Sequence, residues 1–314
     1  MNGQKNLFGH ELPALRRPSR ILERLVRSAV EIEADDPRAI LFQHTVFCQT
    51  GLPYRDPGPT VYEWEREQGH ASLLIEAGRA RDPQSGQWLK LGLPFGPKPR
   101  LILAYLNAEA LRSGSPQIEV DQSLTAFVKR IGLDPKGRNM RIIKDQLARL
   151  SASQIRLAIT YAQDHARQVQ AHIVSGFDLW FPKDERQKVL WPSSVRLSLD
   201  YFESLQRHAV PLDERAVAAL SHSAMGLDIY AWLAQRLHRV HPGRPAFVPW
   251  TALKAQFGWH YGRMDNFKRV YRQALDVVLS QYRGARLELD NRGMTLRNSP
   301  PPVKGRFTLV TPSA

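Results

Sequence analysis

The chain reads SLTAFVKRIGLDPKGRNMRIIKDQLARL from Ser123 to Leu150, and this stretch says most about how the protein folds. Apolar residues recur at helical spacing as far as Ile131, and Gly132 and Pro135 then break the pattern. A second amphipathic run follows the break. The spacing therefore predicts one helix, a tight turn and a second helix, which is a helix-turn-helix.

The second predicted helix carries apolar and basic residues on opposite sides. At about 100° per residue, its apolar side chains fall on one stripe: Met140, Ile143, Leu147 and Leu150. The cations on the other side are Arg138, Arg141, Lys144 and Arg149. A helix held down by its apolar stripe, with arginines facing outward, suits a DNA major groove. The alternative is a solvated charged face, because most charge runs are no more than that.

The chain as a whole is strongly basic. Its 314 residues include 44 Lys and Arg against 30 Asp and Glu, a formal net charge of +14. This balance favours an anionic partner, either a nucleic acid or an anionic membrane surface. No apolar run is long enough to span a bilayer, and the first twenty residues lack the apolar segment of a secretory signal. Cys48 is the only cysteine, which excludes an internal disulfide and favours a cytoplasmic location.

The N-terminal part of the sequence predicts a flexible terminus, residues 1–19, and a small α/β region, residues 20–91. Ser19 is placed to cap a helix from Arg20 to about Glu33 that has a broad apolar side. Two alternating runs then predict paired strands, Val61–Glu67 and Ala71–Glu76. The apolar side of the helix is suited either to the core of the same chain or to self-association or partner contact. This region also shows much less clustering of basic residues than the rest.

A first module is predicted from residue 92 to 205, after the proline-rich linker LGLPFGPKP. The elements expected before the helix-turn-helix are a helix, Arg100–Arg112, and a short strand, Gln117–Val120. After it, two extended runs around a polar turn predict a β-hairpin: Ser153–Tyr161 and Val169–Phe181. Helices, a short strand, a basic helix and a hairpin follow one another in the order of a winged helix.

A second module with the same order is predicted from residue 206 to 300, and residues 301–314 form a C-terminal tail. Its elements are a helix capped by Asp213, further helices Leu227–Val240 and Pro249–Phe257, a basic helix Asn266–Tyr282 and a hairpin Arg286–Arg297. A chance amphipathic helix does not predict its own repetition, so the pairing favours DNA binding. The predicted fold class is α+β, mainly helical, with two tandem winged-helix domains behind the N-terminal region.

Several long phrases of the sequence resemble RepA-type plasmid replication initiators. They are QTGLPYRDPG (Gln49–Gly58), GLPFGPKPRLILAYLNAEALRSGSPQIEV (Gly92–Val120), SLTAFVKRIGL (Ser123–Leu133) and the basic run that ends at Leu150. The resemblance implies two winged-helix domains that bind repeated double-stranded sites in a plasmid origin. It also implies contact with host replication proteins, such as a helicase or its loader, and repression of the initiator's own promoter. Charge and periodicity alone lead only to a basic protein with two winged helices.

The residues expected to contact DNA follow from this arrangement. In the two basic helices they are Arg138, Arg141 and Lys144, then Lys268, Arg269 and Arg272. Asn139 and Gln146 are candidates for reading adenine, because amides pair with it in a bidentate manner. Arg167 and Arg292 are expected in the two wings, where phosphates are the natural partners. A homodimer is a further expected partner state, and no membrane contact is expected.

Catalytic chemistry has weak support in the sequence. Nicking of DNA needs a tyrosine nucleophile and a metal held by paired histidines. The nearest candidates are His238 and His241 at a helix end and Tyr261 in a turn, and the acidic residues Asp178, Asp184 and Glu185 are scattered. We expect no catalytic residue, metal or cofactor. The alternatives are a transcriptional repressor with no replication role and, with less support, an origin-nicking enzyme.

Overall fold

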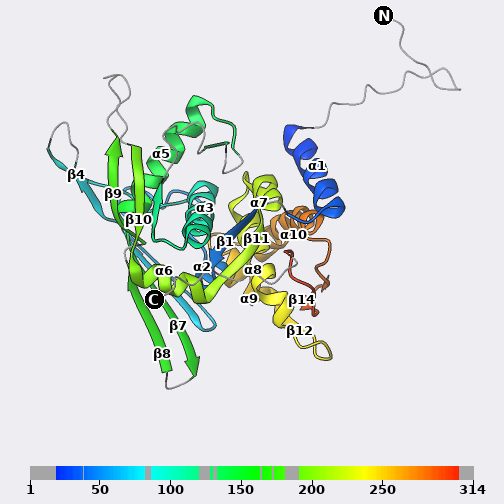
Figure 1. The fold of residues 1–314 in the computed structure, drawn as a ribbon. Helices are drawn as coiled ribbons and strands as arrows, with labels where there is room; N and C mark the ends of the chain where they lie inside the picture. Colours follow the sequence, from blue (N-terminus) through cyan, green and yellow to red (C-terminus); the bar gives the residue numbers. More distant parts are fainter. Residues whose placement is uncertain are drawn as a thin grey trace, which may run out of the picture.

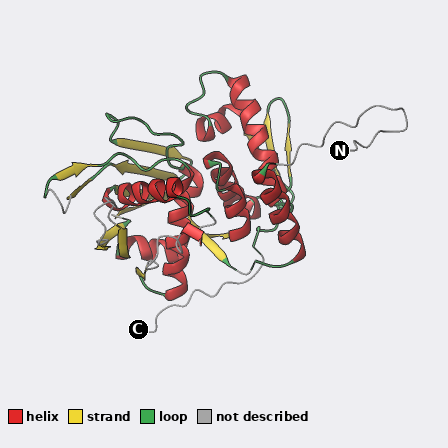
Figure 2. Cartoon of the chain, turned by 90° about the horizontal axis from the view of Figure 1, so that it is seen from above, coloured by secondary structure: helices red, strands yellow, loops and turns green. Residues whose placement is uncertain are grey.

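The computed structural model describes residues 19–37, 39–81, 86–119, 128–129, 133–162, 165–171, 173–180 and 191–303. Helices fill the centre of the molecule and several strands project from it, so the fold is α+β (Figures 1 and 2). The buried apolar residues form one cluster that draws on both predicted modules and on the N-terminal region. Across the described residues, no helix has the length and apolar character to cross a membrane.

Two paired strands at the centre join equivalent parts of the chain. The order helix, strand, helix occurs first as α1 (Arg20–Ala34), β1 (Ile40–His44) and α2 (Thr45–Thr50), and again as α6 (Leu199–His208), β11 (Ala209–Asp213) and α7 (Glu214–Leu220). Strands β1 and β11 pair antiparallel, with the third residue of each, Phe42 and Pro211, opposite one another. Ser19 and Ser198 cap α1 and α6 in the same way, by accepting a hydrogen bond from a backbone N–H three residues on. The internal repeat therefore begins earlier in each half than the predicted winged helices.

The second half of the chain, from α6 onward, contains all the elements of a winged helix in their usual order. Its elements are α8 (Ala224–Arg236) with a short 3-10 turn (Leu237–Arg239), β12 (Ala246–Pro249), α9 (Trp250–Phe257), α10 (Met264–Gln281), β13 (Leu287–Leu289) and β14 (Gly293–Leu296). The strands form one sheet in the order β12-β14-β13. Gly258 ends α9 at a close contact with α10. A Cβ at this position would lie 2.2 Å from the ring of Phe267. The two helices can therefore pack ring against backbone.

The first half repeats this strand order. Its elements are α3 (Pro97–Ser113), β6 (Gln117–Glu119), α5 (Gly137–Ala152), β9 (Val174–Trp180) and β10 (Trp191–Leu197), and its sheet has the order β6-β10-β9. The prediction of a basic helix that ends near Leu150 is confirmed. Only Val128 and Lys129 of the helix expected before it are described, and both are helical. The rest of that predicted helix lies outside the described residues.

The hairpin predicted for the first half forms only in part, and it is not the wing. Strand β7 (Gln154–Ala162) pairs with β8 (His165–Ala171) and also with β3 (Ala71–Glu76), in a sheet of order β2-β3-β7-β8 that begins with β2 (Glu63–Gln68). The strand that pairs with β6 is β10, and β9 is its other neighbour. The run 169–181 thus spans the end of one strand and the whole of another, in different sheets. In Figure 1 the β7–β8 pair points away from the β9–β10 pair.

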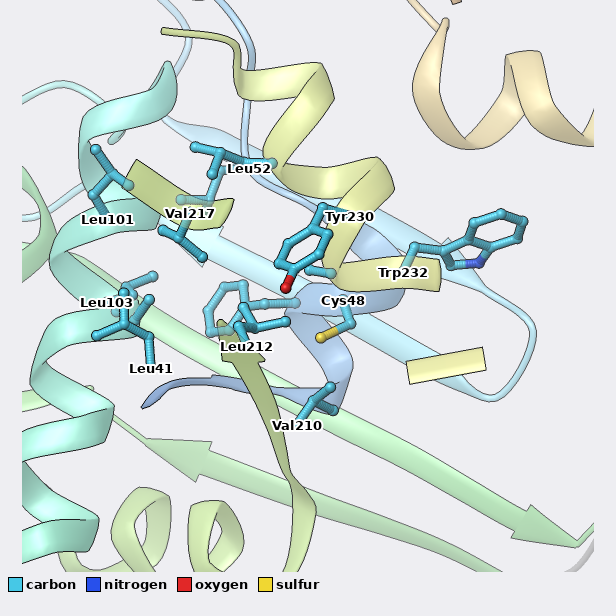
Figure 3. Close-up of a cluster of buried hydrophobic side chains, with 14 of the residues drawn as sticks. Leu41, Cys48, Leu52, Leu101, Leu103, Val210, Leu212, Val217, Tyr230 and Trp232 are labelled. Carbon is cyan, nitrogen blue, oxygen red and sulfur yellow. The ribbon is translucent and has the colours of Figure 1, made fainter. Parts of the chain in front are cut away.

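The N-terminal region is built into both halves. Besides the pairing of β3 with β7, Arg66 of β2 donates to the backbone oxygens of Ala255 and Gln256 at the end of α9. Leu41, Cys48 and Leu52 pack in the same cluster as residues from α3, β11, α7 and α8 (Figure 3). Two further strands, β4 (Arg79–Arg81) and β5 (Trp88–Lys90), pair only with each other.

A buried ion pair joins α3 and α8, the first helices of the two winged-helix arrangements. The Arg100 guanidinium in α3 contacts both oxygens of Asp228 in α8, at 2.6 and 2.7 Å. It also donates to the backbone oxygens of Leu52, Pro53 and Gly96. Arg100 is 5% exposed and Asp228 is 8% exposed. One side chain therefore links α3, α8 and the loop after α2.

Candidate nucleic-acid interface

Helix α10 presents a basic side to solvent because its other side is anchored in the core. Phe267, Tyr271 and Val278 are fully buried. Arg269 and Arg272 are exposed on the opposite side. The helix is 18 residues long, so these arginines lie along a rod of roughly 27 Å, at about 1.5 Å per residue.

The wing of the second half continues this basic side. Lys268 of α10 donates from Nζ to the backbone oxygen of Asn291, 3.2 Å away in the β13–β14 turn. Arg292 in the same turn has a side chain that is 83% exposed. Asp290 accepts from the backbone N–H groups of Arg292 and Gly293, which shapes the turn and lowers the pKa of its carboxyl. We call Lys268, Arg269, Arg272 and Arg292 the α10 surface.

Aromatic rings support the α10 surface from below. The Trp250 ring centre lies 5.1 Å from Nζ of Lys268 and 5.2 Å from the guanidinium carbon of Arg272. The Phe247 ring lies 5.8 Å from the Arg292 guanidinium. A cation over a ring face is attracted by the ring's negative charge density without being neutralised. These contacts therefore orient the cations without neutralising them, and Arg292 also pairs with Asp290 at 3.4 Å.

Helix α5 has the same division of sides. Ile143, Leu147 and Leu150 are at most 1% exposed, as predicted, while Arg138 and Arg141 are exposed. Asn139 donates from Nδ2 to the backbone oxygen of Asp134 at 2.8 Å. Lys144 is half-buried, and desolvation lowers its pKa. We call Arg138, Asn139, Arg141 and Lys144 the α5 surface.

Two polar residues of α5 face inward, and both correct predictions, because Gln146 was expected on the DNA-reading side and Arg149 among the outward-facing cations. Gln146 is 1% exposed, so its expected place on the DNA-reading side is wrong. Its Oε1 accepts from the backbone N–H of Phe95 at 2.8 Å and its Nε2 donates to Asp145. Arg149 pairs with Asp145 at 3.0 Å and donates to the backbone oxygen of Leu93. Both side chains attach α5 to the segment that precedes α3.

Arg167 does not lie in the wing of the first half. It belongs to β8, opposite Ile159 of β7, and its side chain lies outside the described residues. The loop between β9 and β10 contains Lys183, Arg186 and Lys188, which were not among the predicted contacts. That segment also contains Asp184 and Glu185 and lies outside the described residues.

The candidate catalytic groups are engaged locally. His238 Nδ1 lies 3.0 Å from the backbone oxygen of Ala234, and His241 Nδ1 accepts from the N–H of Gly243. Tyr261 packs against the rings of His260 and Phe267. The described part of the chain brings together no group of three His, Cys, Asp or Glu side chains that could hold a metal ion. The side chains of Asp178, Asp184 and Glu185 lie outside the described residues.

Comparison with solved structures relates the fold to two domains of RctB. A crystal structure of selenomethionine derivatives of domains 2 and 3 of RctB gives a TM-score of 0.53 at 10% identity, over 82% of this chain and 99% of that chain. A second crystal structure of RctB domains 2–3 gives 0.44 at 10% identity, over 74% and 82%. At this identity the first comparison supports a shared fold alone.

Comparison by sequence identifies the family. No curated protein sequence matches this chain. A family profile described as "Plasmid encoded RepA protein" matches residues 93–250, which run from the segment before α3 through the first residue of α9. That match covers half of the chain, so this protein belongs to the plasmid-encoded RepA replication protein family.

Proposed function

We propose that this protein is a plasmid replication initiator that binds repeated double-stranded sites in the origin through two tandem winged helices. In this proposal residues 92–205 and 206–300 form the two DNA-binding domains. Helices α5 and α10 enter successive major grooves, and the protein then recruits host replication proteins such as a helicase or its loader. It acts without catalysis, metal or cofactor, in the cytoplasm, and it represses its own promoter.

The observation that carries the proposal is the join between α10 and its wing. The hydrogen bond from Lys268 to Asn291 joins the helix that carries the exposed Arg269 and Arg272 to the turn that carries the exposed Arg292. A helix for the groove and a hairpin for the flanking backbone are the two contacts that a winged helix needs. The same strand order and a similar basic helix in the first half support a second copy of this contact.

The residues then divide by what they can reach. Arg141 and Arg269 are exposed on the basic sides of their helices, which suits guanine edges. Asn139 remains a candidate for adenine, although its amide already donates to Asp134. Arg292 is in a hairpin turn, which suits a phosphate. The buried Arg100–Asp228 pair and the shared core favour joint binding, because they resist independent movement of the two halves.

We include self-association in the proposal because α1 uses only part of its apolar side. Leu25 and Ala29 are buried where α1 packs against α7 and α10. Four large apolar residues of α1 remain between 44% and 59% exposed: Ile21, Leu22, Val26 and Val30. Both expectations for this helix thus have support, one on each part of its surface.

The test starts from duplexes that the full-length chain selects from a random-sequence pool. We expect a footprint of about two turns of DNA on a selected duplex, and protection confined to one turn would contradict joint binding. Supercoiled DNA that carries this site should stay intact with Mg²⁺ and the protein, and nicked circles would indicate an enzyme instead.

A replication assay separates an initiator from a repressor. A plasmid whose only origin is the DNA flanking this gene should give transformants with the wild-type chain. Arg141→Ala/Arg269→Ala should abolish them. Arg207→Ala is the matched control, because Arg207 lies on α6 and pairs with Glu203. A wild-type chain that binds its site but never supports replication would be a repressor alone.

A further inference from the structure

The β4–β5 ribbon adds almost nothing to the core of the protein. Its two strands pair only with each other, and the described residues of the ribbon are exposed apart from the half-buried Ala80. Trp88 is 63% exposed and Leu89 is 50% exposed. A two-stranded hairpin alone is at best marginally stable in water. The ribbon therefore needs a role other than packing.

The register of the ribbon gathers its cations on one face. Arg79 lies opposite Lys90, and Arg81 lies opposite Trp88. Residues directly opposite one another share a face, as do residues two apart on one strand. Arg79, Arg81, Trp88 and Lys90 therefore form a single face, which we call the ribbon face.

The ribbon face is electrostatically unfavourable by itself. Like charges directly opposite each other on paired strands destabilise the pair. The described residues of the ribbon include no Asp or Glu that would offset them. Arg81 donates from Nε to the oxygen of Gly86, and Lys90 Nζ lies 3.1 Å from the Tyr62 ring centre, so both have neutral partners. A face with three cations and an exposed indole fits an anionic ligand.

The base of the ribbon is attached to the proposed recognition helix of the first half. Gly78, just before β4, lies so close to the end of α5 that a Cβ there would be 1.7 Å from the Ala152 oxygen. Leu91 closes the base by donating to the Gly78 oxygen. In Figure 1 the ribbon projects at the edge of the molecule on the same side as α5, β9 and β10.

We propose that the ribbon face is a third contact with duplex DNA, which binds backbone phosphates beside the groove occupied by α5. This inference rests on the proposed function. Arg79, Arg81 and Lys90 supply the cations, and the indole of Trp88 supplies a donor and an apolar plate for phosphate and sugar. Such contacts position the DNA without reading its sequence.

The experiment compares full-length variants on a selected duplex and on a scrambled duplex of equal length. Arg79→Ala/Arg81→Ala/Lys90→Ala should weaken binding to both, since it removes up to three phosphate contacts. The slope of log K against log salt should then fall by up to about 2.7, at about 0.9 for each contact. The ratio of variant to wild-type Kd should shrink by up to about 40-fold between 50 and 200 mM salt, which follows from that slope.

Two matched variants separate charge from shape. Arg79→Lys/Arg81→Lys keeps the charge and should keep the salt slope, whereas Leu89→Ser changes the opposite face and should leave binding unaltered. A hydroxyl-radical footprint of the triple alanine variant should lose protection only next to the α5 half-site. Because the replaced side chains are exposed, circular dichroism should show the variants folded like wild type.

The outcomes of these measurements are distinct. An unchanged salt slope and footprint in the triple alanine variant would refute the ribbon contact while leaving the proposed function intact. A loss of discrimination between selected and scrambled duplexes would also refute it, because the ribbon would then read bases. If the wild-type chain selects no duplex, the proposed function fails and the ribbon contact fails with it. A Leu89→Ser variant that weakens DNA binding while the triple alanine variant does not would also refute the ribbon contact, because the opposite face of the ribbon would then carry the binding.

Discussion

Replacing Arg100 with Met is expected to lower the free energy of unfolding by about 3–5 kcal/mol at neutral pH. In the native protein the guanidinium holds both oxygens of Asp228 and is 5% exposed. It also donates to the backbone oxygens of Leu52, Pro53 and Gly96. Met fills a similar volume but donates nothing. The variant therefore leaves a buried carboxylate and several buried carbonyl groups without their donor, which costs much more than the loss of an exposed pair.

The loss of stability in Arg100→Met should depend on pH, and the surroundings of Asp228 determine the direction. Burial raises the pKa of the Asp228 carboxyl, and both the Arg100 charge and a Tyr54 hydrogen bond oppose that rise. Without Arg100 the pKa should rise further. A group whose pKa is higher when folded contributes stability that is fully present below its unfolded pKa, about 3.9, and is lost as pH rises through the folded value. The gap between wild type and Arg100→Met should therefore be smallest in acid and widen as pH rises from the raised folded pKa of Asp228 in the wild type to its still higher folded pKa in the variant.

The assay is urea unfolding at several pH values, followed by circular dichroism and tryptophan fluorescence. Arg207→Met is the matched control, since Arg207 and Glu203 form an exposed pair and such pairs contribute about 0–1 kcal/mol. Arg100→Met/Asp228→Leu should recover much of the loss, because it removes the unpaired charge. A cost below about 1 kcal/mol for Arg100→Met, or a deficit that stays constant with pH, would contradict the reasoning.

Further predictions concern the surfaces of the molecule. Arg141→Ala should cost about 1–3 kcal/mol on a selected duplex and relax preference at one base pair, whereas an equal loss on a scrambled duplex would make Arg141 a phosphate anchor. Arg292→Ala should weaken selected and scrambled duplexes alike and lower the salt slope by about 0.9, and a sequence-dependent loss would contradict a phosphate contact. Gln146→Ala should cost about 1–3 kcal/mol in urea unfolding, since a buried backbone N–H loses its acceptor, and it should leave the salt slope of DNA binding unchanged. Val26→Ser/Val30→Ser should reduce self-association in analytical ultracentrifugation, and identical sedimentation of variant and wild type would exclude α1 as the dimer surface.

The helices were the part of the fold that the sequence predicted well. Their signal is local, because residues three and four apart share a side of one helix. Ile143, Leu147 and Leu150 predicted the buried stripe of α5. The exposed Arg138 and Arg141 on the opposite side followed from the same angular count, whereas Arg149 turns inward. No distant part of the chain had to be placed for these predictions to hold.

Strand pairing is a different kind of information. Alternation along 153–161 and 169–181 correctly indicated extended chain, but only the start of the second run, in β8, pairs with β7, and the rest forms β9 in another sheet. On one side β7 pairs with β3, which comes from the N-terminal region. Strand β9 pairs with β10. Periodicity identifies a face that will be buried and not the strand that will lie beside it. For that reason Arg167 was assigned to a wing that another hairpin forms.

The burial of Gln146 shows, for a single residue, that periodicity does not identify the neighbouring segment. It lies three residues after Ile143 and four before Leu150, which places it at the margin of the apolar stripe. A polar residue at a margin is expected to turn toward solvent. The segment before α3 crosses this part of α5, however, and Phe95 supplies the N–H that the buried amide accepts. Only the path of that segment decides the burial, and the sequence of α5 does not contain it.

The sequence alone also does not show when charged residues of two paired strands lie on one face, because it does not show the pairing. Residues 20–91 showed little basic clustering in the sequence, because Arg79 and Arg81 are separated from Lys90 by a turn. Antiparallel pairing then brings all three onto one face. A linear count detects cations that share a helix and overlooks cations that share a hairpin, although cations on either element can contact phosphates. The measured salt slope of the full chain should therefore exceed the slope expected from the α5 and α10 surfaces alone.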